Sequence, residues 1–513
     1  MVLESPFPPL HIPDVSIWDL LFDDHNDSKR QIAHPKSDEA LLLSNEDGTQ
    51  TYTAFGVREA ALRFARALQT ILSFGPGDTL AVVSANSVHM APVIWGSLYL
   101  GGVMSPANPG YGVEELQHQL KNSGTTAVVT QAPFLPIVLR AATNAGIAHG
   151  RVILLPSAKS AYVSSLASPL PSGSPWCSTI FEYGGRGERL PSQSEYLPQQ
   201  GCCLLGLLIW HKRAKVVAMS RYTLPLFCKM IKTHRVSLVY LVPPVALELA
   251  HATLSSGAGT DLSSIRFMTS VAAPLSPVIV HALHAQHGIK LIEGYGLSET
   301  SPGALMMARR TVGKLLPNQK AKLLDVGASK REIDPESGQS GEICIKGPNV
   351  FKGYRNNPSA TRDAFTQDGY FRTGDIGVFV KVPRVGICLR ITDCIKELIK
   401  YKGFHVAPAE LEGTLLRHDE GAADVCVVGV QSPQALATEV PRAYVVKTPG
   451  WREVEEERVV AADEIRRWSD KKLANHKKLR GGVVFVDSLP RTPSGKLLRR
   501  VLRDTNLDGK ARL

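Results

Sequence analysis

The sequence has little of what marks secreted, metal-binding or membrane-spanning proteins. Its 513 residues include only eight cysteines, with no CxxC pair and no regular spacing, so a reduced, intracellular protein with single buried thiols is expected. No uncharged apolar run reaches the roughly 18 residues that a membrane span needs. A secretory signal has a basic region followed by an apolar run, and the first residues of this sequence contain neither.

The charge pattern does not favour nucleic acid as a partner. The formal net charge is +11, but the basic residues cluster late, as in DKKLANHKKLR (470–480) and GKLLRRVLR (495–503). Aromatic residues do not alternate with these lysines and arginines, as they do in many nucleic-acid-binding surfaces. An anionic small substrate or cofactor, or a solvated basic face, explains the charge better.

The first 300 residues alternate helical and strand patterns. Helices are predicted at 53–72 and 113–124, and short apolar strands follow at 78–86, 125–131 and 151–156, with others at 237–244, 265–274 and 289–296. Continuous apolar strands between amphipathic helices predict an α/β fold with doubly wound, mostly parallel sheets. Ligands bind beyond the carboxyl ends of such strands, so the residues after 271 and 293 are candidates for a site.

The second part of the chain differs. Residues 341–381 have short β segments interrupted by Gly, Pro and Asn, which predicts a small, turn-rich β unit. The last 110 or so residues mix helix and strand patterns and are long enough for a small α+β domain. We therefore predict an N-terminal domain at residues 1–395 and a C-terminal domain at residues 396–513.

Four short stretches have residue types suited to chemistry. EGYGLSETSPG (293–303) offers glycines for close backbone approach, an aromatic ring, hydroxyls at Ser298 and Thr300, and a carboxylate suited to Mg²⁺. FRTGDIG (371–377) places an aspartate in a glycine-flanked turn, where a carboxylate can bind a ribose diol. KELIKYKGF (396–404) holds three lysines, and LPRTPSGKLLRR (489–500) has a lysine at the end of a Pro-Ser-Gly loop.

Each stretch has an ordinary structural explanation when taken alone. GYG can be a turn at the end of a strand, and it is not a dinucleotide fingerprint because the third glycine of GxGxxG is missing. TGD is a common turn, PSGK can be a helix start, and the lysines of 396–402 can be the wet face of a helix. Their combination and order are more informative than any one of them.

In this order the motifs resemble the adenylate-forming superfamily, and within it the 4-coumarate–CoA ligase-like acyl- and aryl-CoA ligases. The resemblance covers most of the chain and implies a mobile C-terminal domain. Its most specific motifs are DLSSIRFMTSVAAPLSP (261–277), EGYGLSETSP (293–302), GEICIKGPNVFKGYRNNPSAT (341–361), DGYFRTGDIG (368–377), KELIKYKGFHVAPAELE (396–412) and PRTPSGKLLRR (490–500).

Such ligases join a carboxylic acid to CoA in two steps. The acid and Mg-ATP give an acyl-adenylate and pyrophosphate, and the CoA thiol then displaces AMP. The resemblance therefore implies ATP and Mg²⁺ as cofactors, CoA as co-substrate, and a carboxylic acid as substrate. Both steps build negative charge, which fixed cations and hydrogen-bond donors stabilise.

The resemblance also implies a role for single residues of the nucleotide site. Tyr295, between Gly294 and Gly296, would stack on adenine. Ser298 would contact the α-phosphate and Glu299 would hold Mg²⁺. The adenine pocket would be lined by Ala272, Ala273 and Pro274.

Further roles fall on the later motifs. By the same resemblance Asp375 would bind the ribose hydroxyls, and Lys496 would bridge the substrate carboxylate and the α-phosphate, so that Lys496, Glu299 and Ser298 are the catalytic candidates. Lys396 falls at the hinge of the C-terminal domain. Facing the active site in the second, thioester-forming orientation would be Lys400, Lys402 and Gly403.

The sequence departs from the family pattern at four places. Cys394 replaces the usual Arg after Asp393, His405 replaces the usual Gln, and residues 381–393 lack the acidic hairpin turn. The largest departure is the phosphate loop SSGTTGxPKG, which has no match between residues 157 and 236. Such a loop holds the β- and γ-phosphates through backbone N–H groups and hydroxyls, so we predict slow adenylation or none.

The missing family segment indicates a junction at about residues 190–203. There SEYLPQQGCCLLGLLIW (194–210) passes from a polar loop into a strand pattern. The pair Cys202–Cys203 lacks the partner spacing of a metal site, and adjacent cysteines seldom form a disulfide without strain. Alternatives to an active ligase are an impaired family member, a misassembled gene model and, with less support, a nucleotide-dependent enzyme of another class.

The sequence leaves the acid open and suggests an address. Pocket candidates are Tyr240, Val242, Val271 and Gly294, and they leave cinnamate-like, phenylacetate-like and medium-chain aliphatic acids open. The chain ends in Ala511, Arg512 and Leu513, a variant of the S-K-L signal read by the peroxisomal import receptor. A peroxisomal location is expected, with the cytoplasm as the alternative.

Overall fold

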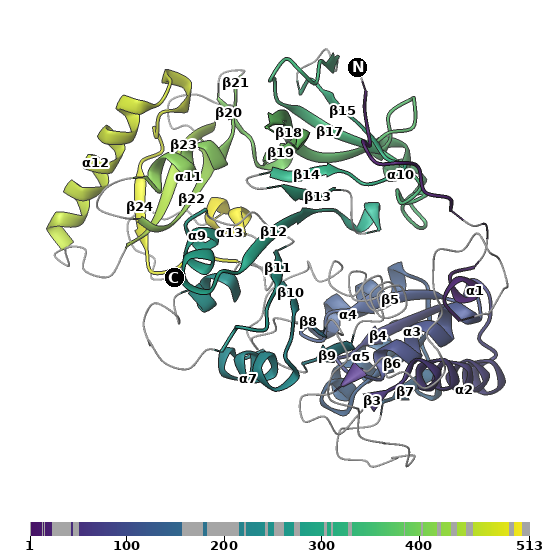
Figure 1. Ribbon diagram of the computed structural model, residues 1–513. Coiled ribbons are helices and arrows are strands. Elements are labelled where there is room, and N and C mark those ends of the chain that lie inside the picture. Colours follow the sequence, from purple (N-terminus) through teal and green to yellow (C-terminus); the bar gives the residue numbers. More distant parts are fainter. Residues whose placement is uncertain are drawn as a thin grey trace. The chain divides into compact units, whose positions relative to one another are not determined.

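The computed structural model describes most of the chain, and the ribbon is shown in Figure 1. The described residues are 2–12, 14, 16–22, 43–44, 51–155, 178–181, 215–219, 222–241, 245–250, 261–270, 277–301, 305–308, 311–326, 331–383, 385–401, 404–417, 422–431, 439–447, 455–491 and 497–504. Both the predicted junction near residue 200 and the C-terminal tripeptide lie outside them.

The chain divides into two compact units, which are not the two predicted domains. The first unit consists of residues 1–9, 304–350 and 357–513, and the second consists of residues 10–303 and 351–356. The short segment 351–356 thus belongs to the second unit, although its neighbours on both sides belong to the first. A domain boundary at residue 396 lies inside the first unit and stays a prediction.

The second unit is the α/β part of the protein. Its elements are α1 (Ile17–Phe22), β2 (Leu43–Ser44), β3 (Thr51–Tyr52), α2 (Ala54–Leu72), β4 (Thr79–Val83), α3 (Met90–Tyr99), β5 (Val103–Ala107), α4 (Val113–Asn122), β6 (Thr125–Thr130), η1 (Ala132–Phe134), α5 (Leu135–Asn144), η2 (His149–Arg151), β7 (Val152–Leu154), β8 (Ser178–Phe181), β9 (Lys215–Ala218), α7 (Leu224–His234), β10 (Leu238–Leu241), β11 (Phe267–Ser270), α9 (Pro277–His287), β12 (Lys290–Tyr295) and η3 (Ser298–Thr300).

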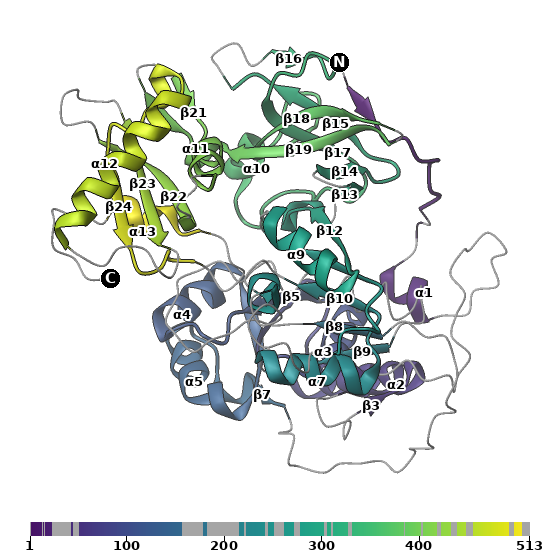
Figure 2. The ribbon, with the colours of Figure 1, turned by 60° about the vertical axis from the view of Figure 1, so that its left-hand side comes forward.

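Helix α2 shows how local sequence defines these elements. The Thr53 side chain accepts the Gly56 N–H at 2.9 Å, which satisfies a free donor of the first turn. Ser73 at the C-terminus adopts a left-handed conformation, and the next N–H bonds back to Leu68. Small and apolar residues of one face are buried against the core, and in Figure 2 α2 runs beside α3.

Two sheets form the second unit, and nearly all their strand pairs are parallel, as predicted. One sheet has the order β5-β4-β6-β7, and the other runs β3-β2-β9-β8-β10-β11-β12, with β2 and β3 its antiparallel pair. Strands β4 and β6 are almost wholly buried, which explains their continuous apolar sequence. The carboxyl ends of β10, β11 and β12 meet at one edge of their sheet.

The first unit combines an antiparallel sheet with a smaller α+β part. Its elements are β1 (Leu3–Glu4), β13 (Leu305–Ala308), β14 (Thr311–Leu315), β15 (Lys320–Leu324), β16 (Glu332–Ile333), β17 (Gly341–Lys346), α10 (Pro358–Ala364), β18 (Phe371–Val382), β19 (Gly386–Cys394), η4 (Ile395–Glu397), β20 (Ile399–Tyr401), β21 (Phe404–Val406), α11 (Pro408–Leu415), β22 (Ala422–Gln431), β23 (Glu439–Lys447), α12 (Glu455–Lys472), η5 (Asn475–Lys477), β24 (Val483–Val486) and α13 (Arg499–Asp504).

The antiparallel sheet is wider than the β unit predicted at residues 341–381. Its order is β1-β15-β17-β18-β19-β14-β13, and β16 pairs with β15. Strands β18 and β19 form a hairpin in which Val382 faces Gly386, with Gly386 at φ 101°. The hairpin therefore closes without the acidic turn that the family usually has, because a glycine supplies the left-handed residue.

The α+β part of the first unit has its own core. Strands β22, β23 and β24 form a sheet, and β20 pairs with β21. Buried residues of β22 and β23 contact apolar residues of α11 and α12 in one cluster and residues of α13 in another. Among the described residues, no helix is long and apolar enough to cross a membrane. Cys228, Cys344, Cys388 and Cys426 are free thiols.

Candidate active site

The GYG–Ser–Glu motif begins in the last two residues of strand β12, which is partly exposed along its length, and continues beyond the strand. Strand β12 pairs in parallel with β11 up to the pair Ser270–Glu293 and then continues to Tyr295. A single 3-10 turn, η3, begins at Ser298. The motif thus lies at the edge where the carboxyl ends of the parallel strands meet, which is the usual ligand-binding edge of such a sheet.

The turn is held from inside by Thr300. Its side chain is fully buried, and its hydroxyl contacts both the N–H of Leu297 at 2.9 Å and the carbonyl of Leu297 at 3.0 Å. Ser301 ends the turn in a left-handed conformation, with φ 50°. The sequence-based suggestion that Thr300 offers a hydroxyl to a ligand is therefore wrong, because that hydroxyl closes the turn. Ser298 and Glu299 remain half-buried.

Glu299 is held by a tyrosine that the sequence did not indicate. The phenol O–H of Tyr354 donates to Oε1 of Glu299 at 2.9 Å, and the backbone N–H of Phe351 donates to the Glu299 carbonyl at 2.8 Å. The ring of Tyr354 packs edge-on against the ring of Phe351, with centroids 4.9 Å apart. Glu299 is thus fixed at both its backbone and its carboxylate.

The electrostatics agree with this arrangement. Burial, together with the hydrogen bond to Glu299 and the negative charge of that residue, raises the pKa of Tyr354 to about 12. The phenol is therefore protonated at any physiological pH and acts as a donor to the carboxylate. One oxygen of Glu299 is oriented by the tyrosine, as is typical of carboxylates whose second oxygen binds a metal.

Segment 351–356 brings Tyr354 to this place. Arg355 donates to the carbonyl of Gly77 at 3.3 Å, which attaches the segment to the loop before β4. Asn356 adopts φ 56° and Gly353 adopts φ 145°, so the chain turns sharply within a few residues. The motif FKGYRN was part of the family resemblance, but its contact with Glu299 spans 55 positions of the chain and leaves no local pattern.

Asp375 lies in the first unit, on β18. Its N–H donates to the Thr373 hydroxyl at 3.1 Å, and that hydroxyl donates to the carbonyl of Ile343 on β17 at 2.8 Å. Gly374, between them, has φ 72°, which favours glycine. Asp375 pairs with Cys394 across the β18–β19 ladder. The cysteine that replaces the family's arginine therefore stands directly opposite the aspartate expected to bind ribose.

The hinge and thioester-forming lysines fall on adjacent short elements. Lys396 lies in η4, and Lys400 lies in β20, where it pairs with His405 of β21. Lys402 and Gly403, which stand between these two strands in the sequence, lie outside the described residues. So do Ala272, Ala273, Pro274, Val242, Val271 and Lys496. The roles of all these residues stay predictions, as do those of Ser298, Glu299 and Asp375.

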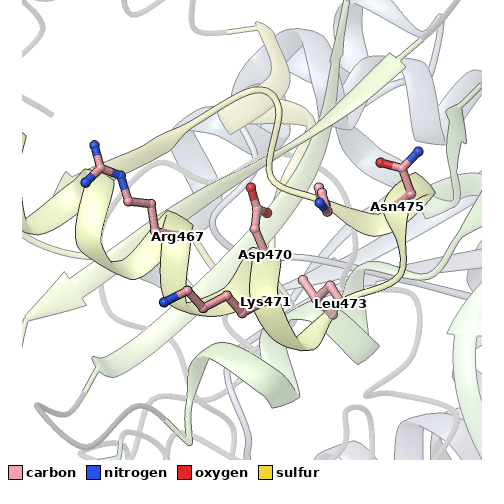
Figure 3. Close-up of a pocket in the computed structure, with 6 residues that line it drawn as sticks. Arg467, Asp470, Lys471, Leu473 and Asn475 are labelled. Atoms are coloured by element: carbon pink, nitrogen blue, oxygen red, sulfur yellow. The ribbon is translucent and has the colours of Figure 1, made fainter.

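One surface pocket is lined by none of the predicted site residues. It encloses about 640 Å³ and lies where α12 meets η5. Figure 3 shows the side chains of Arg467, Lys471 and Asn475 along it. Asp470 in the same pocket accepts the N–H of Leu479 at 3.0 Å, and this fixes the end of the helix. The pocket is open and adds no residue to the candidate site.

The chain matches the family described as AMP-binding enzyme over residues 28–171 and 184–355. It also matches the family described as AMP-binding enzyme C-terminal domain over residues 410–496. The chain therefore belongs to the adenylate-forming, AMP-binding enzymes and, by its relatives, to their 4-coumarate–CoA ligase-like members. The predicted family and enzyme class are confirmed.

Three comparisons illustrate this kinship. The chain is 32% identical to 4-coumarate--CoA ligase-like 1 of Arabidopsis thaliana, over 86% of this chain and 87% of the relative. It is 30% identical to 4-coumarate--CoA ligase 5 of Oryza sativa subsp. japonica, over 98% and 97%. The crystal structure of ATP-bound MatB from Rhodopseudomonas palustris superposes with a TM-score of 0.76 at 22% identity, covering 96% and 99%, and this shows a shared fold.

The comparisons also reveal a break in the match. The family match stops at residue 171 and resumes at residue 184. The alignment with the rice relative extends over 549 positions, although this chain has only 513 residues. The relative therefore contains segments that have no counterpart here.

Proposed function

We propose that the chain is an ATP-dependent acid–CoA ligase that works through an acyl-adenylate. The observation that carries the proposal is the turn after β12, where Glu299 is fixed by Tyr354 at the ligand-binding edge of the sheet. Membership of the AMP-binding enzymes and the names of the plant relatives support the same activity. The substrates are then a carboxylic acid, ATP and CoA.

The proposed reaction has two displacements. An oxygen of the acid's carboxylate attacks the α-phosphorus of ATP, and pyrophosphate leaves. The thiolate of CoA then attacks the acyl carbon, the bond to AMP breaks, and AMP leaves with both electrons. Lys496 would neutralise charge between the carboxylate and the α-phosphate, Ser298 would donate to that phosphate, and Asp375 would hold the ribose.

Glu299 fits a magnesium ion that arrives with the nucleotide. In the part of the chain that the structure describes, no three His, Cys, Asp or Glu residues gather as ligands. Mg²⁺ in nucleotide-dependent enzymes is usually held by one or two carboxylates and by substrate phosphates. A single half-buried carboxylate, with one oxygen held by Tyr354, suits that mode. The ion would neutralise phosphate charge when bound.

A second candidate is an impaired family member that binds nucleotide or acyl group but adenylates slowly. The observation behind this candidate is the absence of a match to the SSGTTGxPKG loop between residues 157 and 236. Each lost hydrogen-bond donor to a developing oxyanion typically costs about 100-fold to 1,000-fold in rate. The half-reaction that releases pyrophosphate would suffer most.

Pyrophosphate–ATP exchange separates the two candidates. The panel would contain 4-coumarate, phenylacetate and hexanoate, one for each acid class left open by the pocket candidates. Exchange that depends on one acid, and that is lost in Lys496→Ala, supports the ligase. No exchange with any acid, together with measurable AMP binding, supports the impaired member.

We also propose that the chain is addressed to the peroxisome by its last three residues. The support is the small–basic–leucine ending Ala511-Arg512-Leu513. A fluorescent reporter fused to the last ten residues is expected to give a punctate signal that overlaps a peroxisomal marker. A diffuse cytoplasmic signal, equal to that of a reporter ending in Ala-Ala-Leu, would overturn this proposal.

A further inference from the structure

A largely buried arginine, Arg499, stands three positions after Lys496 in the sequence. Nη2 of Arg499 lies 2.8 and 2.9 Å from the two carboxylate oxygens of Glu412, and its Nη1 contacts Glu397. Its Nε donates to the carbonyl of Val427 at 3.3 Å. The side chains are 12% exposed for Arg499, 12% for Glu412 and 18% for Glu397. One guanidinium thus contacts two carboxylates, and all three side chains are largely shielded from solvent.

The cluster joins four separate parts of the first unit. Arg499 begins α13, Glu412 lies on α11 and Glu397 lies in η4, next to Lys396. Oε1 of Glu412 also accepts the N–H of Val427 on β22 at 2.8 Å. Attraction by the two carboxylates raises the pKa of Arg499 despite its burial, so the guanidinium stays charged and the two like charges are held together.

The described residues on the two sides of positions 492–496 contact each other. Arg491 forms an isolated antiparallel bridge with Leu497, and the N–H of Leu498 donates to the carbonyl of Pro490 at 2.9 Å. Arg491 binds Asp424 of β22 with Nη2 2.7 and 2.9 Å from the two oxygens. Residues 492–496 lie outside the described residues. The chain on either side of them contacts β22, before them through Arg491 and Asp424 and after them through Nε of Arg499 and the carbonyl of Val427.

We infer that Arg499 is a positioning residue for Lys496. The inference rests on the proposed function, which gives Lys496 its catalytic role. Because the guanidinium fork fixes the first residue of α13, it also fixes where the chain leaves Lys496, three residues earlier. Through Glu397 the same side chain holds the segment next to Lys396 and β20, so both lysine-bearing stretches are attached to one rigid base.

Lysine cannot replace this arginine. The planar guanidinium contacts Glu412, Glu397 and Val427 at once, whereas a lysine ammonium is a compact charge on a flexible chain. Arg499→Lys keeps the positive charge and loses the fork. A general electrostatic role would survive this substitution, and a positioning role would not.

The test compares three variants of the full-length chain. Arg499→Lys and Glu412→Gln disturb the cluster, and Glu410→Gln is the matched control. Glu410 lies on the same helix α11, where its half-exposed carboxylate pairs with Lys477 at 2.6 Å. The readouts are hydrogen exchange of the Leu498 amide, with the amide of Gly481 as an internal reference, and kcat and KM in pyrophosphate exchange.

The inference predicts that Arg499→Lys speeds exchange at Leu498 at least about tenfold and leaves Gly481 unchanged. Glu412→Gln should have a smaller effect in the same direction, and it replaces the lysine variant if that variant fails to fold. The kcat of adenylation should fall about 10-fold to 100-fold at nearly constant KM for ATP, while Glu410→Gln behaves as wild type.

Wild-type exchange at Leu498 and wild-type kcat in Arg499→Lys would overturn the inference. Equal effects of Glu410→Gln and Glu412→Gln would overturn it as well. If the wild-type chain shows no pyrophosphate exchange with any acid, the proposed function fails, whereas the hydrogen exchange of Leu498 still decides whether Arg499 fixes the loop.

Discussion

The phenol of Tyr354 provides a sharp test of how the Glu299 carboxylate is held. Tyr354→Phe removes one oxygen and keeps the ring that packs on Phe351. A hydrogen bond to a charged group is worth about 1.5–3 kcal/mol. Because Tyr354 is 41% exposed, solvent screening reduces this to about 1 kcal/mol, which is a factor of about five in an equilibrium constant.

The assay is the Mg²⁺ dependence of CoA-thioester formation from acid and ATP. We expect the half-saturating Mg²⁺ concentration to rise about fivefold in Tyr354→Phe, because the carboxylate that receives the ion is no longer oriented. The control is Tyr99→Phe, which removes a phenol oxygen from an exposed tyrosine on α3. An unchanged Mg²⁺ dependence in Tyr354→Phe, or an equal shift in Tyr99→Phe, would refute the reasoning.

Three further predictions concern single residues. Cys394→Arg restores the arginine usual in the family at the position that pairs with Asp375, and it should tighten AMP binding severalfold in calorimetry. Weaker binding would speak against a nucleotide site at this ladder. Gly377→Ala should lower the free energy of unfolding by about 1–3 kcal/mol, since an added Cβ would lie 2.9 Å from the carbonyl oxygen of Arg390; an unchanged melting temperature would contradict this. Burial lowers the pKa of His89, so the folded protein loses stability as the pH falls through the unfolded value near 6.5. His89→Gln should therefore lose less free energy of unfolding than wild type between pH 7.5 and 5.5. An equal loss in both proteins would contradict this.

The alternating α/β pattern of the first 300 residues was readable because burial on both faces demands continuous apolar strands. Strands such as β4 and β6 are buried along nearly their full length, so their sequences match the expectation. The antiparallel strands between residues 305 and 333 were not predicted. They are short and carry charged residues such as Lys320 and Lys322, and the strand pattern is therefore weak.

The site could be predicted in part. The motif at 293–299 was recognisable because its residues are adjacent in the chain and follow a strand. Tyr354 was missed because its contact with Glu299 depends on the return of segment 351–356 to the second unit, which no local pattern encodes. The contacts of Arg499 were missed for the same reason, since this residue meets Glu397 across about a hundred positions.

The most direct test of the proposed ligase compares its two half-reactions in one preparation. Thioester formation is measured once from acid, ATP and CoA, and once from a synthetic acyl-adenylate and CoA. Because the missing phosphate loop concerns only the step that releases pyrophosphate, the account predicts rapid thioester formation from the acyl-adenylate and a rate at least about 100-fold lower from acid and ATP. Equal rates from both would show that adenylation does not need the loop, and no thioester from the acyl-adenylate would contradict the proposed function itself.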